Sequence, residues 1–224
     1  MNRSLKWLAT VAISAFALAV LPAVASAGSF ASDCEVGSSC TATGVGGATE
    51  LEDSAGQKVS CESHHVTVGW SFGPTVLITF TNCRETASGF KLSCNSTGGA
   101  AGEIRTNTVS GDLVYIEPSK STPGILLTNL NVTFNCAGFL KKTVTGSIIA
   151  HIENPNCGTF QASHTISFEK AAGAGNQKYR QVTTTGTIFD LIMNNDDGGS
   201  YLTSSLTGTA KLNVNGGNKV KLTC

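Results

Sequence analysis

Residues 126–136 read "LLTNLNVTFNC", and polar and apolar side chains alternate along them. The even positions are largely apolar and end on a cysteine, whereas the odd positions from 129 onward are only asparagine and threonine. A period of two is typical of a β-strand with one face in a core and the other in solvent. This stretch therefore predicts a half-buried strand whose final cysteine points inward.

The same alternation returns in other parts of the chain, at 143–152, 160–168 and 202–214. Turns rich in Gly, Asn, Asp and Pro separate such stretches, and these residues favour the backbone geometry of hairpin turns. We count about ten predicted strands between Lys58 and Leu222. The pattern predicts a single all-β, antiparallel domain that is either a sandwich or a barrel.

The first residues predict an export signal. Two basic residues precede an apolar run from Trp7 to Val20, and the small-residue triplet Ala25-Ser26-Ala27 follows. This is the order of features in a secretory signal peptide, with cleavage expected after Ala27. We therefore predict a signal peptide at 1–27, a partly flexible N-terminal segment at 28–56 and the all-β domain at 57–224, which makes the protein secreted or extracellular.

The charge of the mature chain excludes some partners. Removing Arg3 and Lys6 from 15 basic residues leaves 13 against 15 acidic ones, a net charge of 13 − 15 = −2. Nucleic acids and anionic membranes both require a basic face. We therefore expect neither as the natural partner, and no transmembrane segment after signal cleavage. A cell-wall or extracellular polymer fits the threonine- and asparagine-rich polar faces better.

All eight cysteines follow the predicted signal peptide. An even number in an exported chain favours disulfides over zinc, which usually requires closer pairs of the C-x-x-C type. Cys83 and Cys94 bracket one predicted hairpin, and Cys34 lies close to Cys40, so both pairs are local candidates. The remaining cysteines would form the long-range pairs Cys61–Cys136 and Cys157–Cys224.

Cys83 departs from the alternation of its own strand. Val76, Ile78 and Phe80 share one parity and Cys83 has the other. A bulge or the beginning of the turn could redirect its side chain toward the core.

Three polar residues share parity with core positions. His164 alternates in phase with Phe160 and Ile166, Asp190 with its isoleucine neighbours, and His64 with Val66 and Val68. If they converge, they could form an acid–base or metal cluster. The alternative is that His164 is a hydrogen-bonded core residue and Asp190 ends a strand near a turn, and we favour this interpretation.

A resemblance concerns residues 60–170. It rests on Phe80 to Cys83, Cys94, Gly102-Glu103-Ile104, and three later stretches: Val109 to Leu113, Phe134 to Gly138 and Gly146 to Ile152. In these motifs the chain resembles a group of uncharacterised exported, cysteine-containing β-proteins of soil actinobacteria, of the Solirubrobacter type. The resemblance implies a secreted β-protein and no assigned activity.

The sequence contains no catalytic signature. It lacks a G-x-S-x-G elbow, an H-E-x-x-H helix, a P-loop and a G-x-G-x-x-G motif. We therefore expect no cofactor, no metal and no enzyme, but a secreted or cell-surface β-module with a binding or structural role. The alternative is a carrier barrel for a small apolar ligand, and a hydrolase using His164 and Asp190 ranks third.

Overall fold

The computed structural model describes residues 31–35, 37, 39–71, 73–87, 89–117, 122–182, 187–195 and 201–224. The predicted signal peptide at 1–27 lies outside these residues. The described chain is built from strands and contains one short 3-10 turn, η1 (Asn215–Gly217). This confirms the all-β, antiparallel, disulfide-linked fold class.

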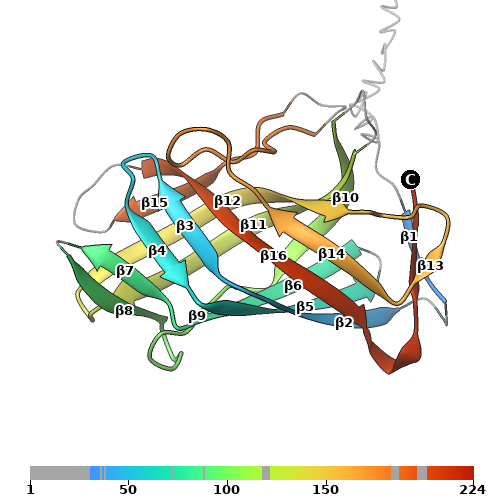
Figure 1. Ribbon diagram of the computed structural model, residues 1–224, viewed down its shortest axis with the longest axis horizontal. Coiled ribbons are helices and arrows are strands. Elements are labelled where there is room, and N and C mark those ends of the chain that lie inside the picture. Colours follow the sequence, from blue (N-terminus) through green and yellow to red (C-terminus); the bar gives the residue numbers. More distant parts are fainter. Residues whose placement is uncertain are drawn as a thin grey trace, which may run out of the picture.

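The structure divides the chain into more strands than the ten or so that the sequence predicted (Figure 1). Those of the first half are β1 (Ala31–Cys34), β2 (Cys40–Gly46), β3 (Thr49–Asp53), β4 (Lys58–Cys61), β5 (Ser63–Ser71), β6 (Gly73–Thr81), β7 (Arg84–Ala87), β8 (Phe90–Ser96) and β9 (Ile104–Arg105). Those of the second half are β10 (Val109–Glu117), β11 (Thr122–Cys136), β12 (Leu140–Glu153), β13 (Phe160–Gln161), β14 (Ser163–Phe168), β15 (Leu191–Asn195), β16 (Tyr201–Val214) and β17 (Val220–Thr223).

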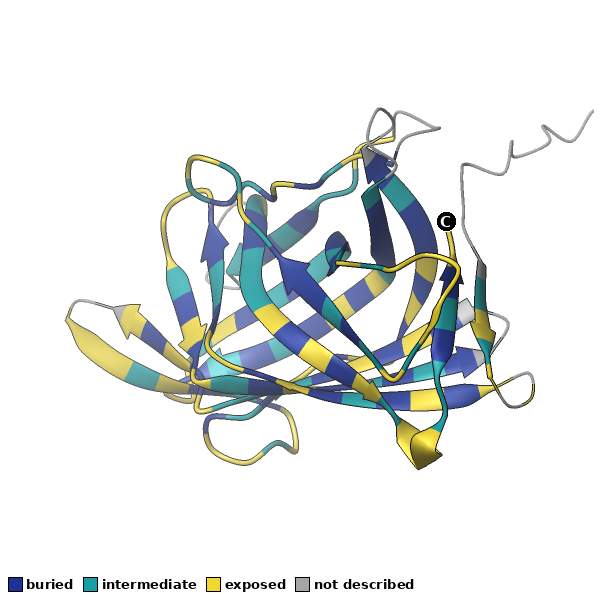
Figure 2. Cartoon of the chain, turned by 45° about the vertical axis from the view of Figure 1, so that its right-hand side comes forward, coloured by how far each residue is buried: buried dark blue, intermediate teal, exposed yellow. Residues whose placement is uncertain are grey.

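Most strands belong to one antiparallel sheet that closes on itself. The sheet has 14 strands, and beyond its linear order β12 pairs with β11, β14 with β16, and β16 with β3. Several consecutive short strands, such as β2 and β3, together form one long strand with a break. Around the wall, the order is β2 with β3, β4 with β5, β6 with β7, β8 with β9 and β10, then β11, β12, β14 with β15, and β16, which pairs again with β2 and β3. Each of these long strands pairs with the next one along the chain, so the sheet is closed and up-and-down (Figure 2).

The interruptions change the parity of several strands. Asn82 has φ 52° between β6 and β7, and Asn129 has φ 62° within β11. Left-handed residues of this kind shift the alternation by one position. Cys83 is therefore fully buried, which confirms its expected redirection. The single alternation predicted for 126–136 is wrong before Asn129, because Leu127 is in the main core and Leu126 joins a separate buried cluster with Ile149 and Tyr179.

The predicted domain boundary at 57 is corrected by the structure. β2 and β3, at 40–53, are part of the large sheet and pair with β16, so they complete its closure. β1 pairs with β17, and β13 pairs with the other edge of β17, in a separate three-stranded sheet. Figure 1 shows this small sheet at one end of the molecule, together with the C-terminus.

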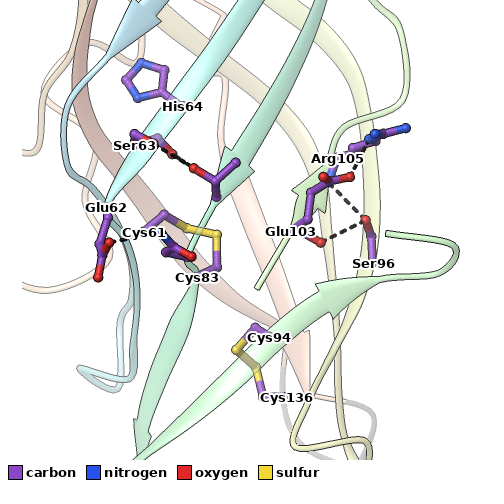
Figure 3. Close-up of a disulfide and its surroundings, with 12 residues drawn as sticks. Cys61, Glu62, Ser63, His64, Cys83, Cys94, Ser96, Glu103, Arg105 and Cys136 are labelled. Carbon is purple, nitrogen blue, oxygen red and sulfur yellow. Dashed lines mark hydrogen bonds and ion pairs between the residues drawn. A yellow bond between two sulfur atoms is a disulfide. The ribbon is translucent and has the colours of Figure 1, made fainter. Parts of the chain in front are cut away.

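Four disulfides connect all eight cysteines. Cys34–Cys40 and Cys157–Cys224 are as predicted. The predicted pairs Cys83–Cys94 and Cys61–Cys136 are wrong: the structure pairs Cys61 with Cys83 and Cys94 with Cys136 (Figure 3).

The pairing follows from the two kinds of residue pair in an antiparallel ladder. Cys83 and Cys94 do lie opposite each other, but the Cys94 N–H donates to the Cys83 carbonyl at 2.9 Å. Hydrogen-bonded opposite residues are farther apart than non-hydrogen-bonded ones, whose side chains are closer. Cys94 and Cys136 are opposite residues of β8 and β11, with Cα atoms 4.0 Å apart. Cys61 on β4, Cys83 directly before β7, Cys94 on β8 and Cys136 on β11 thus lie in a row across neighbouring strands.

Tryptic mapping of the oxidised protein tests this arrangement. Cleavage after Lys58 and Arg84 places Cys61 and Cys83 in one peptide, 59–84. We expect that peptide as an internal loop two hydrogens lighter than its reduced form, and peptide 92–105 linked to 121–141 through Cys94 and Cys136. A link between 59–84 and 92–105 would contradict the structure.

Candidate functional site

The closed sheet encloses an apolar cavity of about 70 Å³. Its lining comes from strands on all sides of the wall, including Leu51, Val59, Ile78, Phe80, Leu127, Leu130, Val132, Phe134, Val144, Ile148, Phe168, Leu191 and Leu206. Thr49 and Thr106 are the polar lining residues, and the Thr106 hydroxyl accepts the Ile78 N–H at 3.0 Å. A cavity with such a lining offers dispersion contacts and almost no hydrogen bonds, so it suits an apolar molecule.

A buried ion pair lies at one end of this cavity. Lys142 on β12 is opposite Phe134, and Glu85 on β7 is opposite Val59, and both of these neighbours line the cavity. The Lys142 Nζ lies 2.9 Å from Glu85 Oε1, and both side chains are 5% exposed. Because opposite residues share one face of a sheet, the pair occupies the interior just beyond the apolar lining.

A turn residue and a residue at the end of a strand complete the hydrogen bonds of the lysine. Lys142 Nζ also donates to Gln57 Oε1 at 2.9 Å and to Asn195 Oδ1 at 2.7 Å. Gln57 is held in place by Asp53, whose Oδ1 accepts the N–H groups of Ala55 and Gln57. All three ammonium hydrogens thus have acceptors, which is the condition under which a buried charge is tolerated. The polar cluster of Gln57, Glu85, Lys142 and Asn195 closes this end of the interior.

Sequence reasoning missed Glu85 and Lys142, although the signal was present. Lys142 shares parity with Val144 and Ile148, which were predicted to face the core, and Glu85 shares parity with Cys83. A lysine and a glutamate at inward positions of separate strands are expected to pair, because an unpaired buried charge is very costly. Which strands would be neighbours could not be read from the pattern.

His64 faces the interior, as predicted. It is 2% exposed, and its Nδ1 lies 3.1 Å from the Gly47 carbonyl, so the ring N–H donates to that oxygen. The ring fills the space above Gly46, where a Cβ would lie 2.0 Å from His64 Cε1. Burial lowers the pKa of His64, which keeps the ring neutral. Glycine at 46 is therefore required by the histidine.

The other two members of the predicted cluster lie in different surroundings. His164 is a buried histidine whose Nε2 lies 3.2 Å from the Val220 carbonyl of β17, and burial lowers its pKa. Asp190 is on the outer side, where Arg180 Nε and Nη2 each donate to one of its carboxylate oxygens at 2.7 Å. Its predicted parity partner Ile188 is 61% exposed, so the inward assignment of Asp190 is wrong.

The described residues contain one group with metal-ligating spacing, formed by Glu85, Cys94 and Cys136. Its two sulfurs are joined in a disulfide, which removes the thiolates that a metal would need. His64, His164 and Asp190 do not form such a group. In the same described part of the chain, no helix is long and apolar enough to cross a membrane.

Acid should destabilise the fold through the two buried histidines. The pKa values of His64 and His164 lie below the ordinary 6.5, so the unfolded chain binds more protons than the folded one below that pH. The contribution of the two neutral histidines to the free energy of unfolding is therefore fully present above pH 6.5. It decreases as the pH falls below 6.5, by at most about 1.4 kcal/mol per pH unit for each histidine. Denaturant unfolding between pH 7 and 5 measures this slope.

Exposed His65 provides the matched control for that measurement. We expect His164→Gln to reduce the slope and His65→Gln to leave it unchanged. An equal slope in the wild-type protein and in a variant lacking both buried histidines would show that other groups cause the acid sensitivity.

Comparisons with family models, with curated proteins and with solved structures give no match. The arrangement of the interior is therefore the basis for a functional conclusion.

Proposed function

We propose that the protein is an exported, non-enzymatic binding protein that holds a small apolar molecule inside its closed sheet. The observation that carries this proposal is the apolar cavity between β3, β4, β6, β11, β12 and β16. Of the functions considered from the sequence, the carrier is the one that needs such an interior. Four disulfides are consistent with export, because these bonds persist in oxidising compartments.

The size of the cavity restricts the ligand. A volume of about 70 Å³ accommodates on the order of five water-sized groups. This points to a short alkyl group of about three to five carbon atoms and excludes an aromatic ring, because benzene occupies an apolar cavity of about 150 Å³. The lining offers few polar partners, so a strongly polar ligand would lose its hydration without replacement.

Titration with xenon, followed by ¹²⁹Xe NMR, and with glycerol as a polar control tests the proposal. Xenon is an apolar atom that enters small apolar cavities, so we expect it to bind with one site per chain and glycerol not to bind. Val132→Phe should abolish xenon binding because the added ring fills the cavity, and Val45→Phe should not, because Val45 is 68% exposed on the outside.

A second variant keeps the test decisive if Val132→Phe is poorly folded. Val144→Ile adds one methylene to the lining and is expected to weaken xenon binding while retaining the fold. If the wild-type protein fails to bind xenon, or if Val132→Phe and Val144→Ile both bind it like the wild type, the cavity is not a ligand site.

A further inference from the structure

The end of the closed sheet that contains the polar cluster also carries three exposed aromatic side chains. Phe90 is 72% exposed, Phe139 is 72% exposed and Tyr201 is 76% exposed. They are the three most exposed large hydrophobic residues in the described part of the chain. We call them the aromatic rim.

The aromatic rim belongs to three adjacent hairpins. Phe90 begins β8 directly after Gly89, Phe139 directly precedes β12, and Tyr201 begins β16. β8 pairs with β11, and β12 pairs with β15, so the β7–β8, β11–β12 and β15–β16 hairpins are neighbours around the wall. Figure 1 shows β7, β8 and β15 at the same end of the molecule, opposite the small sheet.

Two of these hairpins share a short pattern. Gly89 and Gly138 have φ of 82° and 81°, and each is followed by a phenylalanine of the rim. Lys91 follows Phe90 directly, and Lys141 comes two residues after Phe139. Both lysines are exposed. A positive φ before each phenylalanine sets the turn that presents the ring at the hairpin tip.

We propose that the aromatic rim docks this end of the protein on a phospholipid bilayer. Exposed aromatic groups are energetically favourable at the boundary between headgroups and acyl chains, where lysines extend to the phosphates. The rim combines both features: exposed rings at the ends of strands and Lys91 beside Phe90. The sequence between β15 and β16 contains Asp196 and Asp197, whose negative charges offset the positive charges of the lysines. The proposed association therefore depends on the aromatic rings and not on net charge. The docking does not depend on the proposed ligand cavity.

Sedimentation with vesicles of zwitterionic phosphatidylcholine tests the proposal. We expect the oxidised mature protein to pellet with the vesicles, and the variant Phe90→Ser/Phe139→Ser/Tyr201→Ser to partition at least tenfold more weakly. The control is Val45→Ser/Ile188→Ser, which removes exposed apolar groups elsewhere on the surface and should partition like the wild type.

Fluorescence gives an independent readout of depth. Phe139→Trp places an indole at the rim, while the native Trp70 is buried and should not respond. We expect a blue shift on addition of vesicles and quenching by lipids brominated in the acyl chain. No binding of the wild-type protein to vesicles, or equal loss of binding in the control variant, would overturn the proposal. A concentration-dependent dimer that dissociates in the rim variant, without vesicle binding, would also overturn it.

Discussion

Replacing Lys142 by methionine is expected to lower the free energy of unfolding by about 3–5 kcal/mol, because breaking a buried ion pair leaves the other charge without compensation. The Glu85 side chain is 5% exposed and would lose the cation that it contacts at 2.9 Å. Gln57 and Asn195 would lose the ammonium group that donates to both of their side chains. Guanidinium unfolding of the non-reduced protein measures the change.

Lys58 provides a matched control for this substitution. Its ion pairs with Glu50 and Glu52 leave the lysine side chain 42% exposed. Lys58→Met is expected to lower the free energy of unfolding far less than Lys142→Met, because ion pairs in contact with solvent contribute little to stability. The double variant Glu85→Leu/Lys142→Met should recover most of the lost stability, because it removes both charges. If Lys142→Met and Lys58→Met have the same effect, the interior location of the pair is wrong.

Removing the disulfide Cys157–Cys224 should cost about 4 kcal/mol, and removing Cys34–Cys40 about 2 kcal/mol, from the loop entropy of the unfolded chain. The sequence separations are 67 and 6 residues, so the first bond restricts the unfolded chain far more. Replacing both cysteines of each pair by alanine avoids free thiols that could form other bonds. Denaturant unfolding of the two double variants against the wild type gives the comparison.

The two variants serve as controls for each other, since each removes one bond near the small sheet of β1, β13 and β17. Losses that agree within experimental error would show that local packing, rather than loop length, determines the cost.

Local periodicity predicted the strands well but not their breaks. The alternation at 130–136 is correct because each residue there follows the ordinary pleat. It fails at 126–128 because Asn129 adopts a left-handed conformation, which asparagine tolerates but which no alternation reveals. The same reason explains why Cys83 needed a redirection that the sequence could only suggest.

Long-range pairing could not be predicted. Cys83 and Cys94 were correctly placed opposite each other, but the sequence does not show that their pair is the hydrogen-bonded kind. The closure of the sheet depends on β16 meeting β2 and β3, elements separated by more than half of the chain. Glu85 and Lys142 likewise come together only through this closure, so the sequence alone could not predict that they form one interior cluster.

The central claim is that the interior of the closed sheet is a site for a small apolar molecule. Methyl-labelled NMR under increasing xenon pressure tests it most directly, because each methyl group reports its own surroundings. We predict that the methyl signals of Leu130, Val144 and Leu191, which line the cavity, shift with a single saturation curve, and that those of exposed Val45 and Leu77 do not. Shifts confined to the exposed methyl groups, or no shifts at all, would contradict the claim.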